Sequence, residues 1–182
     1  MSLFMSSKEK QYLANIEAIY ADKLGNCFMS DLKARRQLVR AVADFHEDRY
    51  EASLSKLKRL QDRGMVPKDR QVVLFFEGAC SKGLGRLDQA VCYYEEVLRI
   101  TPTYSPALSN LSVIYIDVGN YQQALPYAKK AVESNPDNPY AAHNLATIQF
   151  NLYHRDEAKK YAMKAISLLP QFKQSFSLLA MI

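Results

Sequence analysis

Residues 71–172 repeat one pattern three times with a period of 34 residues. The segments 71–104, 105–138 and 139–172 align without a gap, and small residues, tyrosine and proline fall on shared positions. The shared positions include Leu111 and Leu145; Ala90, Ala124 and Ala158; Tyr93, Tyr127 and Tyr161; Ala131 and Ala165; and Pro102, Pro136 and Pro170. A unit of this length forms two helices that cannot bury their apolar faces alone, so neighbouring units must stack. The period therefore predicts an all-α chain of antiparallel helix pairs.

Glycine, proline and capping residues set the expected helix boundaries. Ser105 and Asn138 each stand beside a proline, so we expect their side chains to cap the helices that follow. Gly119 predicts a sharp turn between paired helices, whereas Tyr153 at the same position of the next segment predicts a less regular turn. The expected helices cover 70–84, 87–100, 106–118, 121–134, 140–152 and 156–168.

The period and the shared positions resemble those of the tetratricopeptide repeat, a helix–turn–helix unit. The resemblance implies a right-handed α-α superhelix, which is a solenoid of antiparallel helix pairs. The implied division is 1–30, an N-terminal capping helix that runs to about Leu24; 31–69, a divergent first repeat; 70–104, 105–138 and 139–172, three complete repeats; and 173–182, the first helix of a truncated unit or a C-terminal capping helix.

Two residues depart from the repeat at positions where helices pack together. Gly78, Ser112 and Ala146 occupy one crossing position, where small side chains let two helices approach closely. Tyr94, by contrast, is a bulky filler at a position where the later repeats have alanine. Glu77 stands where the pattern expects leucine, so it either reaches solvent at the edge of the packing or pairs with a basic side chain.

Charge and hydropathy argue against nucleic-acid and membrane binding. The net charge is +5, and the excess lies mainly in residues 1–70, which hold 14 Lys and Arg against 10 Asp and Glu. Lys33, Arg35, Arg36 and Arg40 predict a basic helix without interleaved aromatics, which favours a solvated helix face over a nucleic-acid surface. No apolar run approaches the roughly 18 residues that a membrane-spanning helix needs.

The three cysteines, Cys27, Cys80 and Cys92, are odd in number and irregularly spaced. This pattern argues against a disulfide framework and indicates a reducing, cytoplasmic location. We expect Cys80 to be a small core residue and Cys92 to lie on the outer face.

The sequence carries no recognisable catalytic or metal-binding pattern. His46, His143 and His154 fall in different repeats or turns, without a second histidine at helical spacing. A glycine-rich phosphate loop, a nucleophile elbow and an HExxH helix are also missing from the sequence. We therefore expect no catalytic residue, no metal, no cofactor and no enzymatic activity.

The family resemblance also implies a binding surface. In tetratricopeptide repeats the first helix lines a concave groove through its second, fifth, sixth, ninth and thirteenth positions. Carried over to this chain, the groove consists of Val72, Phe75, Phe76, Ala79, Ser109, Asn110, Val113, Asp117, Tyr140, His143, Asn144, Thr147 and Asn151.

Asn110 and Asn144 share the sixth position of that groove. Their carboxamides can pair with the backbone of an extended peptide whatever its side chains are, because each has donors and acceptors. The alternative is that both asparagines simply face water. Phe75 and Phe76 either add an apolar wall to the groove or are covered by the first repeat.

These observations predict a non-enzymatic scaffold whose groove binds a peptide or helix of a partner protein. One alternative is a structural module that self-associates through its terminal helices, with the apolar C-terminal edge as the surface for a homo-oligomer. Another is the recognition part of a longer enzyme or regulator. A clamp for the acidic tails of heat-shock chaperones is not expected, because only Asn110 fits the five positions that such clamps use.

Overall fold

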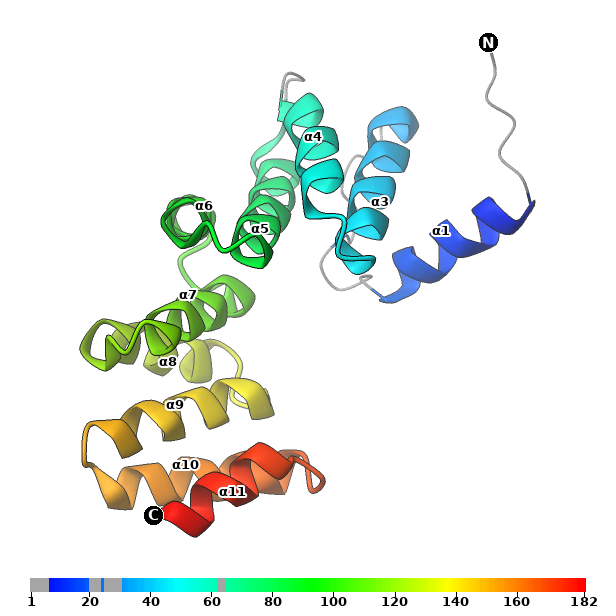
Figure 1. The fold of residues 1–182 in the computed structure, drawn as a ribbon. Coiled ribbons are helices and arrows are strands. Elements are labelled where there is room, and N and C mark those ends of the chain that lie inside the picture. Colours follow the sequence, from blue (N-terminus) through cyan, green and yellow to red (C-terminus); the bar gives the residue numbers. More distant parts are fainter. Residues whose placement is uncertain (1–6, 20–23, 25–30, 62–64) are drawn as a thin grey trace. The chain divides into compact units, whose positions relative to one another are not determined.

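The computed structural model describes residues 7–19, 24, 31–61 and 65–182, and the regular secondary structure of these residues is entirely helical (Figure 1). The helices are α1 (Ser7–Ile19), α3 (Leu32–His46), α4 (Tyr50–Gln61), α5 (Pro67–Gly83), α6 (Leu87–Ile100), α7 (Ser105–Asp117), α8 (Tyr121–Ser134), α9 (Pro139–Asn151), α10 (Arg155–Leu168) and α11 (Lys173–Met181). The predicted all-α class is confirmed. The chain divides into two compact units, unit 1 up to Ile100 and unit 2 from Thr101.

Unit 1 consists of the helix pairs α3–α4 and α5–α6, with α1 packed against α3 and α4 against α5. Its core is built from large side chains, and Leu38, Leu57, Leu60, Phe76 and Tyr94 are all fully buried. Of the expected N-terminal helix, the described part α1 ends at Ile19, while Leu24 is helical and buried.

Unit 2 consists of the pairs α7–α8 and α9–α10, followed by α11, which packs on α10. Its core differs from that of unit 1 because small residues line the second helices. Ala124, Ala128, Ala158 and Ala162 are fully buried and let α8 and α10 lie close to their neighbours. The three expected pairs of helices in residues 70–168 are therefore present.

The same tight turn joins the two helices of every pair. Its central residue has a positive φ, which is 58° at Asp48, 72° at Gly85, 74° at Gly119 and 64° at Tyr153. The Tyr153 amide donates to the Phe150 carbonyl at 3.0 Å, as the Gly119 amide does to Ile116 at 2.9 Å. The expectation of a less regular turn at Tyr153 was therefore wrong, because the flanking helices impose this turn even on a tyrosine.

The two expected caps before proline behave differently. The Asn138 side chain accepts hydrogen bonds from the amides of Tyr140 and Ala141, at 3.0 and 3.3 Å, and so caps α9 as predicted. Ser105 does not cap α7, because it is already the first helical residue and its hydroxyl donates to the Ala131 carbonyl at 3.3 Å.

Helix α5 begins three residues earlier than the repeat predicts, at Pro67 instead of residue 70. Val66 precedes it in an extended conformation, with φ −68° and ψ 154°, and Pro67 occupies the first turn, where its missing amide costs nothing. The extra residues before the second repeat thus lengthen a helix, and α5 runs across the expected boundary between 31–69 and 70–104.

The crossing of α5 and α6 combines the smallest residue with the largest. A Cβ atom on Gly78 would lie 2.8 Å from Cε1 of Tyr94, whose side chain is fully buried. In the later repeats the corresponding pairs are Ser112 with Ala128 and Ala146 with Ala162. Tyr94, which the sequence predicted to be a bulky filler, therefore fills the space that a side chain at position 78 would occupy.

Glu77 is fully buried, so neither expectation for it was correct. Its Oε2 accepts a hydrogen bond from the side-chain amide of Gln61 on α4, and its Oε1 has no hydrogen-bond partner among the described residues. Burial raises the pKa of Glu77 from 4.5 to about 7, against the opposing effect of the Gln61 hydrogen bond. The hydrogen-bond partner is an amide instead of a base, and the charge of Lys58 offsets the burial of the carboxylate only in part.

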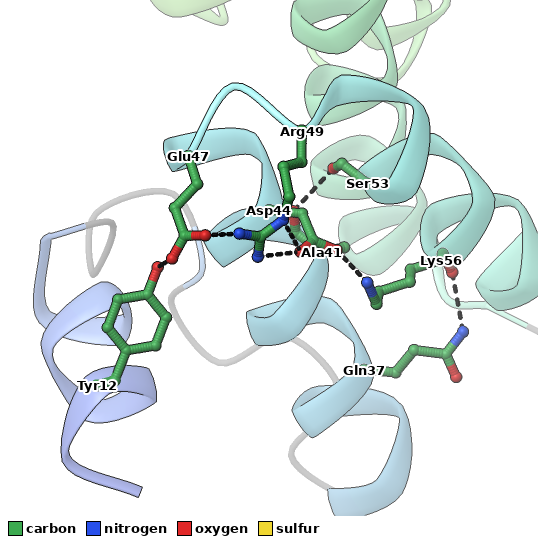
Figure 2. Close-up of polar contacts among 8 residues, drawn as sticks. All are labelled: Tyr12, Gln37, Ala41, Asp44, Glu47, Arg49, Ser53 and Lys56. Atoms are coloured by element: carbon green, nitrogen blue, oxygen red, sulfur yellow. Dashed lines mark hydrogen bonds and ion pairs between the residues drawn. The ribbon is translucent and has the colours of Figure 1, made fainter. Parts of the chain in front are cut away.

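A polar network joins α1, α3 and α4 (Figure 2). Asp44 is nearly buried and pairs with Arg49, at 2.6 Å, and with Lys56 of α4. Burial alone would raise the pKa of Asp44, but hydrogen bonds from Lys56 and Arg49 and their charges hold it below its ordinary value. Arg49 also pairs with Glu47, which accepts a hydrogen bond from the Tyr12 hydroxyl of α1.

Candidate functional site

The candidate site is the face that the first helices of unit 2 share. Helix α7 contacts α9 directly, so equivalent positions of the two helices lie on one continuous face. Asp117 and Tyr140 are exposed on it, and the other predicted residues of this face are half-buried, namely Ser109, Asn110, Val113, His143, Asn144, Thr147 and Asn151. Unit 2 thus keeps every predicted groove residue of α7 and α9 at least partly accessible.

Asn110 and Asn144 carry the hydrogen-bonding capacity of this face. They occupy equivalent positions of α7 and α9, 34 residues apart, and both side chains are half-buried. Among the residues that the structure describes, neither carboxamide has a hydrogen-bond partner within the protein. Each therefore offers an NH₂ donor and a carbonyl acceptor to a ligand.

The remaining polar side chains of the face largely bond to their own helices. The Thr147 hydroxyl donates to the His143 carbonyl at 3.1 Å, and the Asn151 side-chain amide donates to the Thr147 carbonyl at 2.8 Å. The buried Ser109 hydroxyl oxygen has no partner within the described part of the chain. These contacts make the two asparagines the most available donors and acceptors.

The N-terminal end of α9 is covered by residues that lead into α11. Phe172 packs against the rings of Tyr140, at 5.1 Å between centroids, and of His143, at 4.9 Å. Nδ1 of His143 lies 2.9 Å from the Ser175 hydroxyl, and burial lowers the pKa of this histidine below its ordinary value. Sequence analysis missed this contact, because Phe172 and Ser175 lie outside the five groove positions.

Unit 1 does not offer the corresponding residues. Phe76 is fully buried and its ring packs edge-on against Phe45 of α3, at 5.7 Å. Phe75 is 5% exposed and packs against Phe76 and against Tyr94. The first repeat therefore covers Phe76, which was one of the two expectations, and only Ala79 of these groove positions is half-buried.

Neither a metal-binding cluster nor a membrane-spanning helix is found among the described residues. Among them, no cluster of three or more His, Cys, Asp or Glu side chains could hold a metal ion. None of the helices in the described ranges has both the length and the apolar character needed to cross a membrane. Cys80 is buried and its thiol pKa is raised by burial to about 11, whereas Cys92 is exposed, both as predicted. Cys27 lies outside the described residues.

Comparison with known sequences supports the repeat assignment. Two sequence models of the tetratricopeptide repeat match the chain, one over residues 73–104 and one over residues 116–182. No curated protein sequence matches it.

Solved structures share the fold at low sequence identity. The structure of MamA residues 41 to the end, from Desulfovibrio magneticus RS-1, is 19% identical and superposes with a TM-score of 0.71, covering 82% of this chain and 83% of its own. The OM64 TPR domain from Arabidopsis is 20% identical, with a TM-score of 0.61 over 64% of this chain and 96% of its own. The first TPR of Spaghetti (RPAP3), bound to the HSP90 peptide SRMEEVD, is 21% identical, with a TM-score of 0.60 over 62% of this chain and 89% of its own.

Proposed function

Because the chain belongs to the tetratricopeptide repeat family, we propose that it is a non-enzymatic scaffold that binds a segment of a partner protein. The binding surface is the face of α7 and α9 in unit 2. The free cysteines Cys80 and Cys92 fit a reducing compartment, and we place the protein in the cytoplasm.

The proposal rests on the side-chain amides of Asn110 and Asn144, which have no hydrogen-bond partner among the described residues. An extended peptide has no hydrogen bonds within itself, so each residue presents an amide and a carbonyl to its surroundings. Asn110 and Asn144 can each satisfy one donor and one acceptor of such a backbone. Backbone pairing of this kind fixes the course of the peptide without specifying its side chains.

Side-chain selectivity comes from the residues beside the asparagines. Val113 and the aromatic ring of Tyr140 offer apolar contacts, and Asp117 is the one acidic side chain on this described face. The face therefore favours apolar or basic segments over acidic ones, and its binding depends only weakly on salt.

A displayed library of unstructured peptides, selected on the purified protein, provides the test ligands. The double variant Asn110→Ala with Asn144→Ala removes up to four hydrogen bonds, each contributing about 1 kcal/mol. We expect the selected peptides to bind it at least about tenfold more weakly in calorimetric titration.

The matched control is Gln122→Ala, which removes an exposed carboxamide from the second helix α8. It should leave peptide affinity unchanged. If the selected peptides bind the double variant and the unaltered protein with equal affinity, the binding surface is not the face of α7 and α9.

A further inference from the structure

A pocket of about 350 Å³ opens between the helices α8, α9 and α10 of unit 2. Helix α8 lines it with Lys129 and Glu133, α9 with Gln149, and α10 with Glu157 and Tyr161. Pockets that bind ligands have volumes from about 300 Å³ upwards. The space between the three helices is therefore large enough for one bulky side chain of a partner protein.

The pocket lies on a different side of α9 from the asparagine face. Side chains four residues apart share one side of a helix, so Leu145 and Gln149, which both line the pocket, lie together. The helical spacing puts Asn144 and Asn151 on the other side of α9. An occupant of the pocket therefore does not compete with a peptide on the face of α7 and α9.

In the preceding repeat, a tyrosine fills the equivalent place. Tyr115 and Tyr127 occupy the positions of Gln149 and Tyr161, 34 residues earlier in the sequence. Their rings stack, with centroids 5.7 Å apart and planes 11° from parallel. Glutamine has no ring, so the stack at Gln149 and Tyr161 lacks one of its two members. The side of the Tyr161 ring that lines the pocket is therefore open to an aromatic ring from outside.

The charges around the pocket favour a neutral occupant. Lys129 and Glu133 both line it, and neither has an ion-pair partner among the described residues, so they contribute one charge of each sign. Glu157 pairs with Lys160 at 3.4 Å. Nζ of Lys160 lies 5.3 Å from the centroid of the Tyr161 ring, but this lysine is 63% exposed and is not one of the residues that line the pocket. Because these charges balance, the pocket suits an uncharged ring better than an ionised group.

Gln149 adds a fixed hydrogen-bond donor to the pocket. Its side chain is 5% exposed, and its Oε1 accepts a hydrogen bond from Nδ1 of His154 at 2.8 Å. Its Nε2 has no hydrogen-bond partner among the described residues and is not closed off from solvent. Because His154 holds the oxygen, the NH₂ group is left to donate to a backbone carbonyl of a bound segment.

We propose that this pocket binds a tyrosine or phenylalanine side chain from a segment of a partner protein. The ring of the partner stacks on Tyr161 in the place that Tyr115 takes beside Tyr127, and it packs against the apolar side chains of Val132 and Leu145. The NH₂ group of Gln149 donates to a carbonyl of the same segment. This second site selects an aromatic side chain, whereas the asparagine face pairs with a peptide backbone.

The test selects a displayed peptide library on the double variant Asn110→Ala with Asn144→Ala, so that peptides of the asparagine face are not enriched. We expect the selected peptides to share an aromatic residue, and its replacement by alanine to weaken their binding at least about tenfold in calorimetric titration. In the same double variant, Gln149→Tyr supplies the missing ring from within the chain, as Tyr115 does in the preceding repeat. It should fold normally and weaken binding by at least a similar factor.

A second variant, Tyr161→Leu, removes the stacking ring but keeps an apolar side chain, and it should also weaken binding at least about tenfold. Gln122→Tyr and Tyr153→Leu make the same exchanges at exposed positions outside the pocket and should bind the peptides unchanged. The proposal is overturned if no peptide is selected, if the peptides share no aromatic residue, or if either pocket variant binds them as tightly as its control. These outcomes do not depend on the asparagine face, because every comparison is made in a chain that lacks both asparagines.

Discussion

At the residue scale, Glu77 links the stability of unit 1 to pH. Its pKa of about 7 in the folded chain exceeds the ordinary value of 4.5, so folding favours the protonated form. The stability that Glu77 contributes is therefore highest below about pH 4.5, decreases as pH rises towards 7, and is flat above. A pKa shift of this size corresponds to a loss of about 3 kcal/mol in the free energy of unfolding between low and high pH.

We expect Glu77→Gln to remove this dependence, because glutamine keeps the shape and carries no titrating proton. Urea unfolding followed by circular dichroism, at about pH 5 and about pH 8, measures the difference in unfolding free energy. Glu133→Gln, at an exposed position of α8, should retain the dependence of the unaltered chain. A decrease of similar size in the Glu77→Gln variant would assign the titration to another group.

Tyr153 adopts a backbone conformation that glycine adopts more easily. Its φ of 64° puts the Cβ atom close to backbone atoms, and the side chain is 87% exposed and gains little from packing. Tyr153→Gly should raise the unfolding free energy by about 1 kcal/mol. Thermal unfolding provides the measurement, and Tyr153→Ala, which removes the ring but keeps the strain, should give no such gain.

At the scale of elements, Asp44 connects the two helices of the first pair. Its carboxylate is nearly buried and holds Arg49 and Lys56, which are 52% and 34% exposed. Asp44→Asn removes the negative charge that both cations face. We expect the free energy of unfolding to fall by about 1–3 kcal/mol, and not by more because the cations are partly solvated. The exposed pair of Glu51 with Arg86 is the comparison, and Glu51→Gln should cost less than about 1 kcal/mol in the same urea unfolding experiment.

If Asp44→Asn lowers the free energy of unfolding no more than Glu51→Gln does, the polar network around Asp44 contributes little to stability. The link from Arg49 through Glu47 to Tyr12 extends the same network to α1, so hydrogen exchange in α1 should also increase in the Asp44 variant.

The sequence predicted most elements of residues 70–182, because a repeated pattern states the same helix three times. The predictions were wrong where tertiary contacts, instead of the repeat pattern, decide the role of a single residue. Ser105 bonds to a carbonyl of α8 instead of capping α7, and Pro67 starts α5 inside a segment that the period assigns to a link. The site shows the same division. Repeat spacing predicted equivalent positions for Asn110 and Asn144 on one face. Cover over Phe76 by α3 was only one of two expectations, because residues 31–69 match the repeat weakly.

At the scale of the whole molecule, the fold is shared with the Spaghetti domain that is bound to the peptide SRMEEVD. This chain has Phe75, Ala79, Tyr140 and Asn144 at positions where acidic-tail clamps need other polar or basic groups, so we do not expect it to bind the same ligand. We expect calorimetric titration with SRMEEVD to give no saturable binding, with peptides selected on this protein as the positive control. Binding of SRMEEVD comparable to those peptides would contradict the expectation.

The contact between Gly78 and Tyr94 has a consequence for inheritance and engineering. A recombined array whose boundary falls between the two residues places an alanine or serine, the residues of the later repeats, against the Tyr94 ring. That product closes the helix pair only if the buried Tyr94 ring is displaced. The two residues must therefore be transmitted together, and anyone who grafts this repeat into a designed array has to transfer α5 and α6 as one cassette.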